Sequence, residues 1–151
     1  MVFDLGDDLN GSERIEQALD RSAQILSYCF SNKLIWLRIV LWTNDDEKRL
    51  INAGLDFNNA KESFKNEVGE QVLYLEGKYS SSFVYPIVRS IVNFDLGEEP
   101  YANITCYFID FESQFIVNIY DDRGMDIYSL NNLLLRDVEL KFSKWLNKRR
   151  I

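Results

Sequence analysis

The chain has 151 residues, 46% of them hydrophobic and 14% aromatic, and its formal net charge is −7. This length and composition exclude a disordered chain and predict one domain, residues 1–151, which buries roughly 70% of its unfolded surface and needs no metal or disulfide to hold a core. The acidic excess argues against nucleic-acid phosphate as a partner and favours basic partners.

The first forty residues predict a strand, a long helix and a central strand. A short strand is expected at residues 3–5. Apolar residues then recur at helical spacing, so a helix is expected at about 11–30, and the segment Asn10–Glu13 has the composition of a capping box that would begin it. The run 34–42 is rich in β-branched and aromatic residues on both faces, which is typical of a strand inside a sheet.

The next segment predicts one short helix and a polar connection. Residues 44–47 repeat the capping-box composition, and Gly54 is a typical helix stop, so a short helix is expected between them. Residues 56–67 are polar apart from two phenylalanines and one alanine, and we expect a loop or a second short helix there.

From residue 70 onward the pattern is mainly that of strands. Residues 71–75 predict one strand, and 82–93 predict an extended segment that Pro86 confines to a sheet edge or a bulge. Residues 103–111 and 115–120 are strong strand patterns separated by three residues, which predicts an antiparallel hairpin.

The C-terminal part predicts a turn at 121–124, a short strand at 125–128 and a last helix that begins near 129–131. The expected apolar face of this helix consists of Leu134, Leu135, Val138, Phe142, Trp145 and Leu146. The whole order predicts an α+β fold: a mostly antiparallel sheet of about five to six strands, with an N-terminal helix, a short second helix and a C-terminal helix packed on one face.

The residues that most enzymes use are scarce in this chain. It has no histidine, which removes the commonest general base and the commonest ligand of transition metals. Its two cysteines, Cys29 and Cys106, are too few for a four-thiolate zinc site and are expected to be reduced core residues. No phosphate-binding glycine motif is present. We therefore expect no catalytic residue, no metal and no cofactor, and a protein that acts by binding.

Carboxylate chemistry is the alternative. Acidic pairs occur at Asp7–Asp8, Asp45–Asp46, Glu98–Glu99 and Asp121–Asp122, and each also has a structural explanation in a helix first turn, a loop or a hairpin turn. A metal-dependent hydrolase or nuclease would use Asp110, Glu112, Asp121 and Asp122. The positions after Glu112 lack the lysine that such nuclease sites usually add, so binding remains the favoured function.

The densest group of polar residues between two apolar strands is the segment 120–126. One interpretation is structural: aspartates in a turn bond their own backbone amides, Gly124 takes the left-handed conformation of a bulged hairpin, and Arg123 pairs with Asp121 or Asp126. The other is a recognition edge of polar contacts with aromatic anchors beside them. Its expected contact residues are Asp121, Asp122, Arg123, Asp126, Tyr120 and Tyr128.

The same region carries a resemblance. The segments Tyr107–Asp110 and Phe115–Ile127 resemble the C-terminal signature of an uncharacterised bacterial domain family, in which an aromatic hairpin leads into Tyr-Asp-Asp-Arg-Gly-hydrophobic-Asp and then into a terminal helix with a tryptophan, here Trp145. The N-terminal segment that begins at Phe3–Gly6 also fits this family, whereas residues 43–85 are not covered. The resemblance implies a shared fold and, because the family has no established activity, no catalytic residues.

By type, a small, acidic, histidine-poor α+β chain also resembles the immunity proteins of contact-dependent inhibition and polymorphic toxin systems. Such proteins bind and neutralise one cognate toxin, often a basic nuclease. This resemblance implies a protein toxin as the partner, with Asp45, Asp46, Glu98 and Glu99 as further acidic contacts. A housekeeping regulatory module of the uncharacterised family is a third possibility, and the oligomeric state stays open.

The location and the uneven charge complete the expectations. Residues 1–8 have neither the basic nor the long apolar region of a secretory signal, and the run 34–42 is far shorter than the ~20 residues that span a membrane, so a cytoplasmic protein without membrane contact is expected. Residues 136–151 hold six basic and two acidic groups, which suits the C-terminus of a helix, and the rest of the chain carries −11.

Overall fold

A computed structural model of the chain describes residues 1–6 and 10–147, apart from the side chains of residues 59–61. The predicted pair Asp7–Asp8 and the last basic residues, 148–150, lie outside the described residues. The elements in chain order are β1 (Val2–Asp4), α1 (Gly11–Phe30), β2 (Leu34–Leu41), α2 (Asn44–Asn52), the 3-10 helix η1 (Phe57–Asn59), β3 (Ala60–Lys65), β4 (Gln71–Lys78), α3 (Ser81–Phe94), β5 (Ile104–Asp110), β6 (Phe115–Ile119), β7 (Gly124–Ser129), α4 (Asn132–Lys141) and the 3-10 helix η2 (Ser143–Trp145).

The strands form one antiparallel sheet in the order β1-β7-β6-β5-β2-β4-β3. The predicted hairpin is confirmed, since β5 pairs with β6 through Asp110 opposite Phe115. The α+β class with an antiparallel sheet is therefore confirmed. Within residues 1–6 and 10–147, the sheet has seven strands rather than five to six, and there is a fourth α-helix, α3, that the sequence pattern did not predict.

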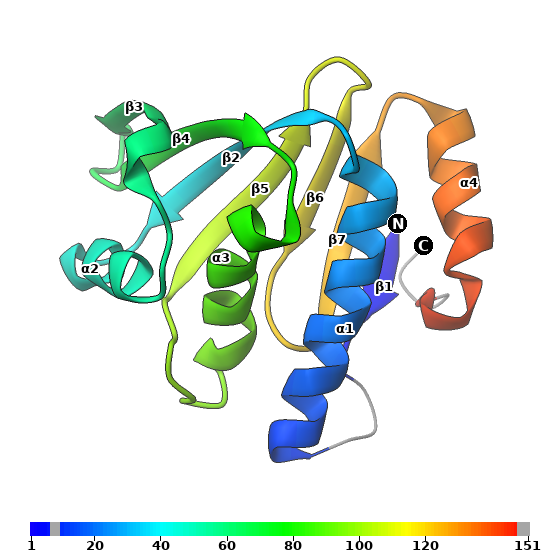
Figure 1. The fold of residues 1–151 in the computed structure, drawn as a ribbon, viewed down its shortest axis with the longest axis horizontal. Helices are drawn as coiled ribbons and strands as arrows, with labels where there is room; N and C mark the ends of the chain where they lie inside the picture. The colour runs from blue at the N-terminus through cyan, green and yellow to red at the C-terminus, as the bar shows by residue number, and fades with distance from the viewer. Residues whose placement is uncertain (7–9, 148–151) are drawn as a thin grey trace.

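The helices lie on one side of the sheet (Figure 1). There α1 and α3 run side by side across the face, α4 lies beside β7, and α2 lies near the end of β2. Alternate side chains of the central strand β2, such as Ile35, Leu37 and Ile39, are fully buried against this helical layer. The main core cluster consequently combines these strand residues with residues of all four helices, including the predicted buried thiols Cys29 and Cys106.

The strand side chains on the opposite face take no part in that core. Val40, Val72 and Ile109 are buried but lie outside the main cluster, and their neighbours Trp36 and Tyr107 remain partly exposed. We call this surface the open face. In β2 to β7 its side chains are Leu34, Trp36, Arg38, Val40, Glu62, Phe64, Val72, Tyr74, Glu76, Lys78, Thr105, Tyr107, Ile109, Ile116, Asn118, Asp126 and Tyr128.

The predicted helix at 11–30 is confirmed residue for residue, but its predicted capping box is wrong. Asn10 has the extended conformation of an N-cap, yet its side chain accepts no capping hydrogen bond. The second capping box exists one residue earlier than predicted. Thr43 is the N-cap of α2, and its backbone N–H donates to the Asp46 carboxylate at 2.9 Å, while the Thr43 side chain accepts from the N3 backbone.

The largest error concerns the segment predicted to be extended because of Pro86. It is the helix α3, and its N-cap is Ser80, whose hydroxyl accepts from the Phe83 N–H at 3.1 Å. A proline inside a helix costs roughly 3 kcal/mol. Burying five aliphatic side chains at helical spacing outweighs that cost, at ~1.5–3 kcal/mol each. These side chains are Val84, Ile87, Val88, Ile91 and Val92.

The segment 56–67 is also only partly as predicted. It contains the short η1, but most of it is the edge strand β3, paired with β4 through Ser63 opposite Leu73. A register shift between Ala60 and Glu62 marks a bulge in this edge. Polar residues form a strand here because β4 supplies the backbone partners, a contribution that strand propensity does not include.

Helix α4 begins as predicted. The Asn131 side chain caps it by accepting from the Leu134 N–H at 3.2 Å. Val138 and Phe142 of its predicted apolar face are buried, and the ring of Phe142 stacks on Trp145 of η2 with centroids 5.4 Å apart. The chain after η2 then pairs with β1, because the Asn147 N–H donates to the Val2 carbonyl at 2.9 Å.

Candidate functional site

The turn between β6 and β7, residues 120–124, is bound to the N-terminal segment. The N–H groups of Leu5 and Gly6 donate to the carbonyls of Arg123 and Asp122, each at 2.8 Å. A Cβ on Gly6 would lie 2.7 Å from the Asp122 carbonyl oxygen, so the two backbones are in direct contact. The turn that the sequence singled out is thus part of the packed structure.

Asp121 bonds its own turn, as the structural interpretation predicts. Its carboxylate accepts from the Arg123 backbone N–H at 2.7 Å and from the Arg123 guanidinium at 3.0 and 2.5 Å. Asp121 is buried, whereas the Arg123 side chain is largely exposed. Of the two predicted partners of Arg123, the structure therefore selects Asp121 rather than Asp126.

Asp122 is more deeply buried and forms an ion pair with Arg14 of α1. Burial raises the pKa of the Asp122 carboxyl; the charges of Asp121 and Asp95 raise it further, and the Arg14 guanidinium acts in the opposite direction. Asp122 thus ties the turn to α1 and cannot meet a partner without breaking this ion pair.

Gly124 has a role different from the predicted one. It does not have a positive φ, so it supplies no left-handed residue. A Cβ at this position would instead collide with the Tyr120 ring and lie 3.0 Å from the Phe3 carbonyl oxygen. Glycine is needed because Tyr120 and β1 both pack directly against its backbone.

The same corner gathers three carboxylates. Oxygen atoms of Asp95, Asp121 and Asp122 lie within 4.8 Å of one another, the one such group of potential metal ligands among the described residues. Two arginines already contact it, since Arg123 binds Asp121 and Arg14 binds Asp122. Their charges oppose a further cation at this corner.

The hydrolase set predicted from the sequence is not assembled. Asp110 and Glu112 lie at one end of β6, in the hairpin that precedes Phe115, whereas Asp121 and Asp122 follow Ile119 at its other end. A five-residue strand spans about 17 Å. One or two metal ions about 4 Å apart cannot bridge that distance.

Asp110 instead holds the β5–β6 hairpin. Its carboxylate accepts from the backbone N–H groups of Glu112 and Ser113 at 3.1 and 3.4 Å, and from the Ser113 hydroxyl at 2.6 Å. The Lys33 ammonium lies 3.3 Å away. Burial alone would raise the pKa of Asp110, but the Ser113 hydrogen bonds and the Lys33 charge outweigh it and lower that pKa.

The other predicted contacts are dispersed. Asp46 is buried and, besides its capping role, accepts from the Asn103 N–H at 3.1 Å, so it joins α2 to the start of β5. Asp45, Glu98 and Glu99 are exposed, and Glu99 lies 3.8 Å from Arg49. Glu99 thus lies beside α2, whereas Asp95, four residues earlier in the chain, lies beside the turn at 120–124.

Two predicted contacts belong to the open face. The Tyr128 side chain is 49% exposed, and its hydroxyl donates to the Asp126 carboxylate at 3.0 Å. Asp126 lies opposite Asn118 of β6. The structure therefore divides the predicted recognition edge into a buried turn and two residues of a broad exposed surface.

The open face contains the recognition residues that the sequence analysis missed. Four aromatic rings form a continuous series, which we call the aromatic ridge: Phe64, Tyr74, Trp36 and Phe111. Each ring centroid lies 6.3 Å from the next, so the ridge crosses β3, β4, β2 and the end of β5. The alternation of residue types along 34–38 and 105–111 could have indicated this face, because every second residue in these segments is large or polar.

Comparison with known proteins gives one match. The model of the family described as domain of unknown function DUF3885 matches residues 3–150. The chain belongs to this family. No curated protein and no solved structure matches it. Membership of an uncharacterised family was predicted, and it transfers no activity to any residue of this chain.

An apolar groove lies beside the aromatic ridge in this family member. It has a volume of about 670 Å³, and its lining includes Ile109, Phe111, Ile116, Tyr128, Leu130 and Leu135. Leu130 and Phe111 are 81% and 60% exposed. The groove continues the open face toward α4 and offers space for an apolar side chain.

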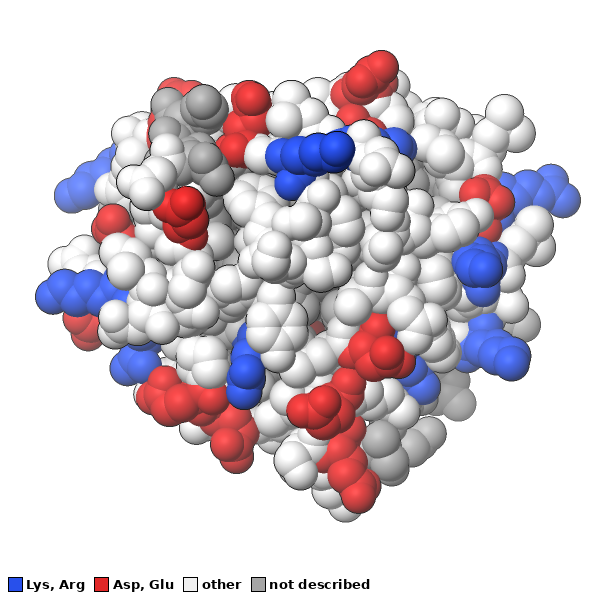
Figure 2. Space-filling model, in the orientation of Figure 1, with Lys and Arg blue, Asp and Glu red and all other residues white. Residues whose placement is uncertain are grey.

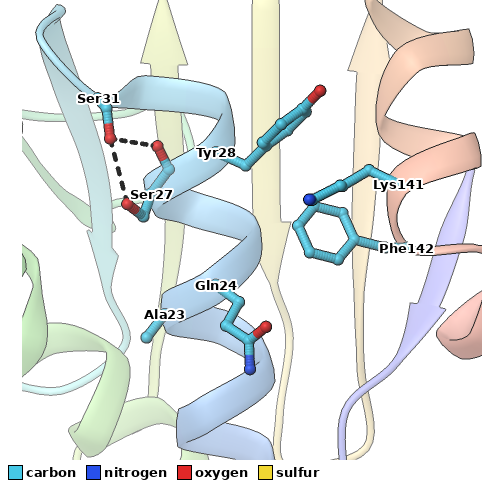
Figure 3. A pocket seen from close by; sticks show the side chains of 7 residues that line it. All are labelled: Ala23, Gln24, Ser27, Tyr28, Ser31, Lys141 and Phe142. Atoms are coloured by element: carbon cyan, nitrogen blue, oxygen red, sulfur yellow. Dashed lines mark hydrogen bonds between the residues drawn. The ribbon is translucent and has the colours of Figure 1, made fainter.

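A second hollow, of about 590 Å³, runs along α1 toward the end of α4 (Figure 3). Ser27 and Ser31 bond each other on one side of it, while Tyr28, Lys141 and Phe142 converge on the other. The Tyr28 hydroxyl donates to Asp137 of α4 at 2.6 Å, and Lys141 lies over the Tyr28 ring. These contacts join two helices and form no catalytic arrangement among the lining residues.

The helices also bear on the predicted absence of membrane contact. None of the described helices combines the length and the apolar character that a membrane crossing requires.

Proposed function

We propose that this chain is an immunity protein, which binds a cognate basic bacterial toxin in the cytoplasm and neutralises it by protein–protein contact. The proposal includes neither a catalytic residue nor a cofactor. The observation that carries it is the open face, a rigid sheet surface that presents partly exposed aromatic rings outside the protein's own core.

Such a surface is suited to recognition. Phe111 and Tyr128 are 60% and 49% exposed, and Trp36 and Tyr74 are half-buried. Partly buried aromatic side chains on a fixed backbone lose little conformational entropy on binding, and they dominate the affinity of many interfaces. The aromatic ridge and the adjoining groove form an exposed apolar patch, which is typical of an interaction site.

Charge supports the choice of a basic partner. The chain outside residues 136–151 carries −11. On the helical side, acidic side chains form two groups in the lower half of the view and also occur along its upper edge, with lysines and arginines interspersed among them (Figure 2). A negative exterior accelerates the encounter with a positively charged protein, and this acceleration weakens as salt rises.

The two alternatives receive less support. A hydrolase would need its carboxylates in one place, but Asp110 and Glu112 lie at the end of β6 opposite to Asp121 and Asp122. A housekeeping regulatory module has no observation that favours it over an inhibitor. It differs in one respect, because its loss would affect growth of the bacterium even without a toxin.

The test uses the neighbouring reading frame. If that frame encodes a large secreted protein with a variable C-terminal domain, the isolated domain is expressed in a laboratory strain with and without this chain. We expect growth arrest without the chain, restored growth with it, and a purified complex whose dissociation constant rises at least tenfold between 50 and 300 mM salt. A toxic domain that still arrests growth in the presence of this chain would contradict the proposal.

A further inference from the structure

The cross-strand register places carboxylates next to aromatic rings on the open face. Glu76 of β4 lies directly opposite Trp36 of β2, and Glu62 of β3 lies opposite Tyr74 of β4. The Cβ atoms of directly opposite residues in an antiparallel pair are ~4.5–5.5 Å apart. Each of these carboxylates is therefore a neighbour of a ring, and Asp126 with Tyr128 forms a third such pair through their hydrogen bond.

The ring of Trp36 is fixed in position but not covered. Tyr74 and Phe111 flank it with interplanar angles of 74° and 69°, so both neighbours meet it edge to face. Trp36 is nevertheless only half-buried. Part of its ring is consequently available to a group that approaches the open face from solvent.

The carboxylates of the open face have no ion-pair partner among the described side chains. The face carries Glu62, Glu76 and Asp126, and the cations Arg38 and Lys78. Arg38 lies over the Tyr107 ring at 6.0 Å, and neither cation is within ion-pair distance of the three carboxylates. None of the three carboxylates is therefore engaged in an ion pair with these cations, and each can bind a cation of a partner together with its neighbouring ring.

The chain itself shows how such a pair binds a cation. Arg49 lies 4.3 Å over the Tyr101 ring, and its guanidinium is 3.8 Å from the Glu99 carboxylate. Likewise, Arg21 lies 5.1 Å over the ring of Trp145. A planar guanidinium stacks on a ring and pairs with a carboxylate at the same time, which an ammonium does less well.

We propose that the open face binds arginine side chains of a basic protein segment, and that the Trp36–Glu76 pair is the central site. This inference rests on the proposed function for the basic nature of the partner. The acidic surface of the chain, with a net charge of −7, opposes single-stranded nucleic acid as the occupant, although exposed rings on a sheet also suit stacked bases.

The apolar groove adds a spacing requirement. Trp36 lies opposite Ile109 at the near side of the groove, and Ile109 lies opposite Ile116, so two strand spacings separate the arginine site from Ile116 inside the groove. Two spacings are about 10 Å, the reach of about three residues of extended chain. The preferred segment therefore has a large apolar residue three positions after the arginine.

The test uses a dodecapeptide of three Arg-Gly-Ser-Leu repeats, with Lys-Gly-Ser-Leu and Arg-Gly-Ser-Ser repeats for comparison. The indole N–H signals of Trp36 and Trp145 in a ¹⁵N-labelled sample serve as reporters. We expect a saturable shift of the Trp36 signal and none of Trp145, because Arg21 already occupies that ring. The lysine peptide and the peptide without leucine should each bind at least threefold more weakly.

Two variants and a matched control locate the site. Glu76→Gln should weaken binding of the arginine peptide about fivefold and Trp36→Ala about tenfold, as expected for a partly exposed ion pair and cation–π contact. Glu139→Gln removes the same charge from an exposed position on α4 and should leave the affinity within twofold. If Trp36→Ala does not fold, the affinities of Glu76→Gln and Glu139→Gln for the arginine peptide are sufficient to test the site.

Several results would overturn the inference: equal losses in Glu76→Gln and Glu139→Gln, a shift of Trp145 instead of Trp36, or tighter binding of a dodecathymidylate than of the peptide. A dimer in sedimentation that Trp36→Ala dissociates would assign the face to a second copy of the chain. If both variants still neutralise the toxin, only the inference fails; if the peptide binds at Trp36 but no toxin is neutralised, only the proposed function fails.

Discussion

The substitution Gly6→Ala tests whether the turn at 120–124 is a packed element. The new Cβ would lie 2.7 Å from the Asp122 carbonyl oxygen and 2.9 Å from the Arg14 carbonyl oxygen, and both are backbone atoms that cannot move alone. Overpacking of this kind costs roughly 1–3 kcal/mol, and weakening the 2.8 Å hydrogen bond from Gly6 to Asp122 adds about 1 kcal/mol. The lower entropy of the unfolded alanine chain returns ~0.4–1 kcal/mol.

The expected net loss is therefore about 1–3.5 kcal/mol, or about 3–12 °C in Tm for a chain of this length. Urea and thermal unfolding followed by circular dichroism measure it. Gly77→Ala is the matched control, because the three atoms nearest to its Cβ would all belong to the Phe83 ring, the first at 3.1 Å, and a side chain can turn away. We expect it to cost less than ~1 kcal/mol. A Gly6→Ala protein as stable as the wild type, or a Gly77→Ala protein equally destabilised, would refute the reasoning.

Three further predictions concern individual side chains. Asp122→Lys places a cation beside Arg14 in a buried site and should lower the free energy of unfolding by roughly 3 kcal/mol or more. Asp126→Lys on the open face should change the free energy of unfolding by less than ~1 kcal/mol. Equal melting temperatures of the two variants would contradict this prediction. Hydrogen bonds and Lys33 lower the folded-state pKa of Asp110 below its ordinary 3.8, so the stability that this carboxylate contributes is complete above that value and is lost as the pH falls through the folded-state pKa. The urea midpoint of Asp110→Asn should therefore be lower than that of the wild type at pH 7 and should fall less between pH 5 and 2. Parallel pH profiles of the two proteins would contradict this prediction. Burial raises the pKa of Cys29 to about 12, and Cys106 is buried as well, so iodoacetamide at pH 8 should leave both thiols unmodified until urea unfolds the protein. Mass spectrometry measures the extent of modification. Rapid labelling of the native protein would contradict this prediction.

The elements that the sequence predicted well are those whose local pattern and tertiary environment agree. In α1 the apolar residues recur at helical spacing, and the same residues, such as Ile25 and Leu26, are fully buried against the sheet. In β5 and β6 the three residues between two apolar runs leave a hairpin as the natural connection.

In helix α3 the effect of one proline on the prediction conflicts with the helical spacing of the apolar residues around it. The spacing of Val84, Ile87, Val88 and Ile91 is helical, whereas Pro86 alone predicts an extended segment, and in the folded chain the four buried aliphatic residues prevail. The opposite holds for β3. Its polar sequence has no strand pattern. The segment forms a strand because it pairs with β4, and the local sequence carries no information about that partner.

The candidate site was located by composition rather than by exposure. A cluster of aspartates and an arginine predicted a recognition edge, yet Asp121 and Asp122 are buried because they bind Arg123 and Arg14. The open face depends on register across strands that are far apart in the chain. That Glu76 lies beside Trp36 follows from the pairing of β2 with β4, which the sequence alone does not specify.

The central claim is that the protein works by binding a basic toxin through the open face. Isothermal titration of the purified toxin domain from the neighbouring reading frame with the wild-type chain, the double variant Trp36→Ala/Glu76→Gln and the control Glu139→Gln tests it most directly. We expect the dissociation constant to rise about fiftyfold or more for the double variant and less than twofold for the control. An unchanged dissociation constant for a correctly folded double variant would contradict the claim.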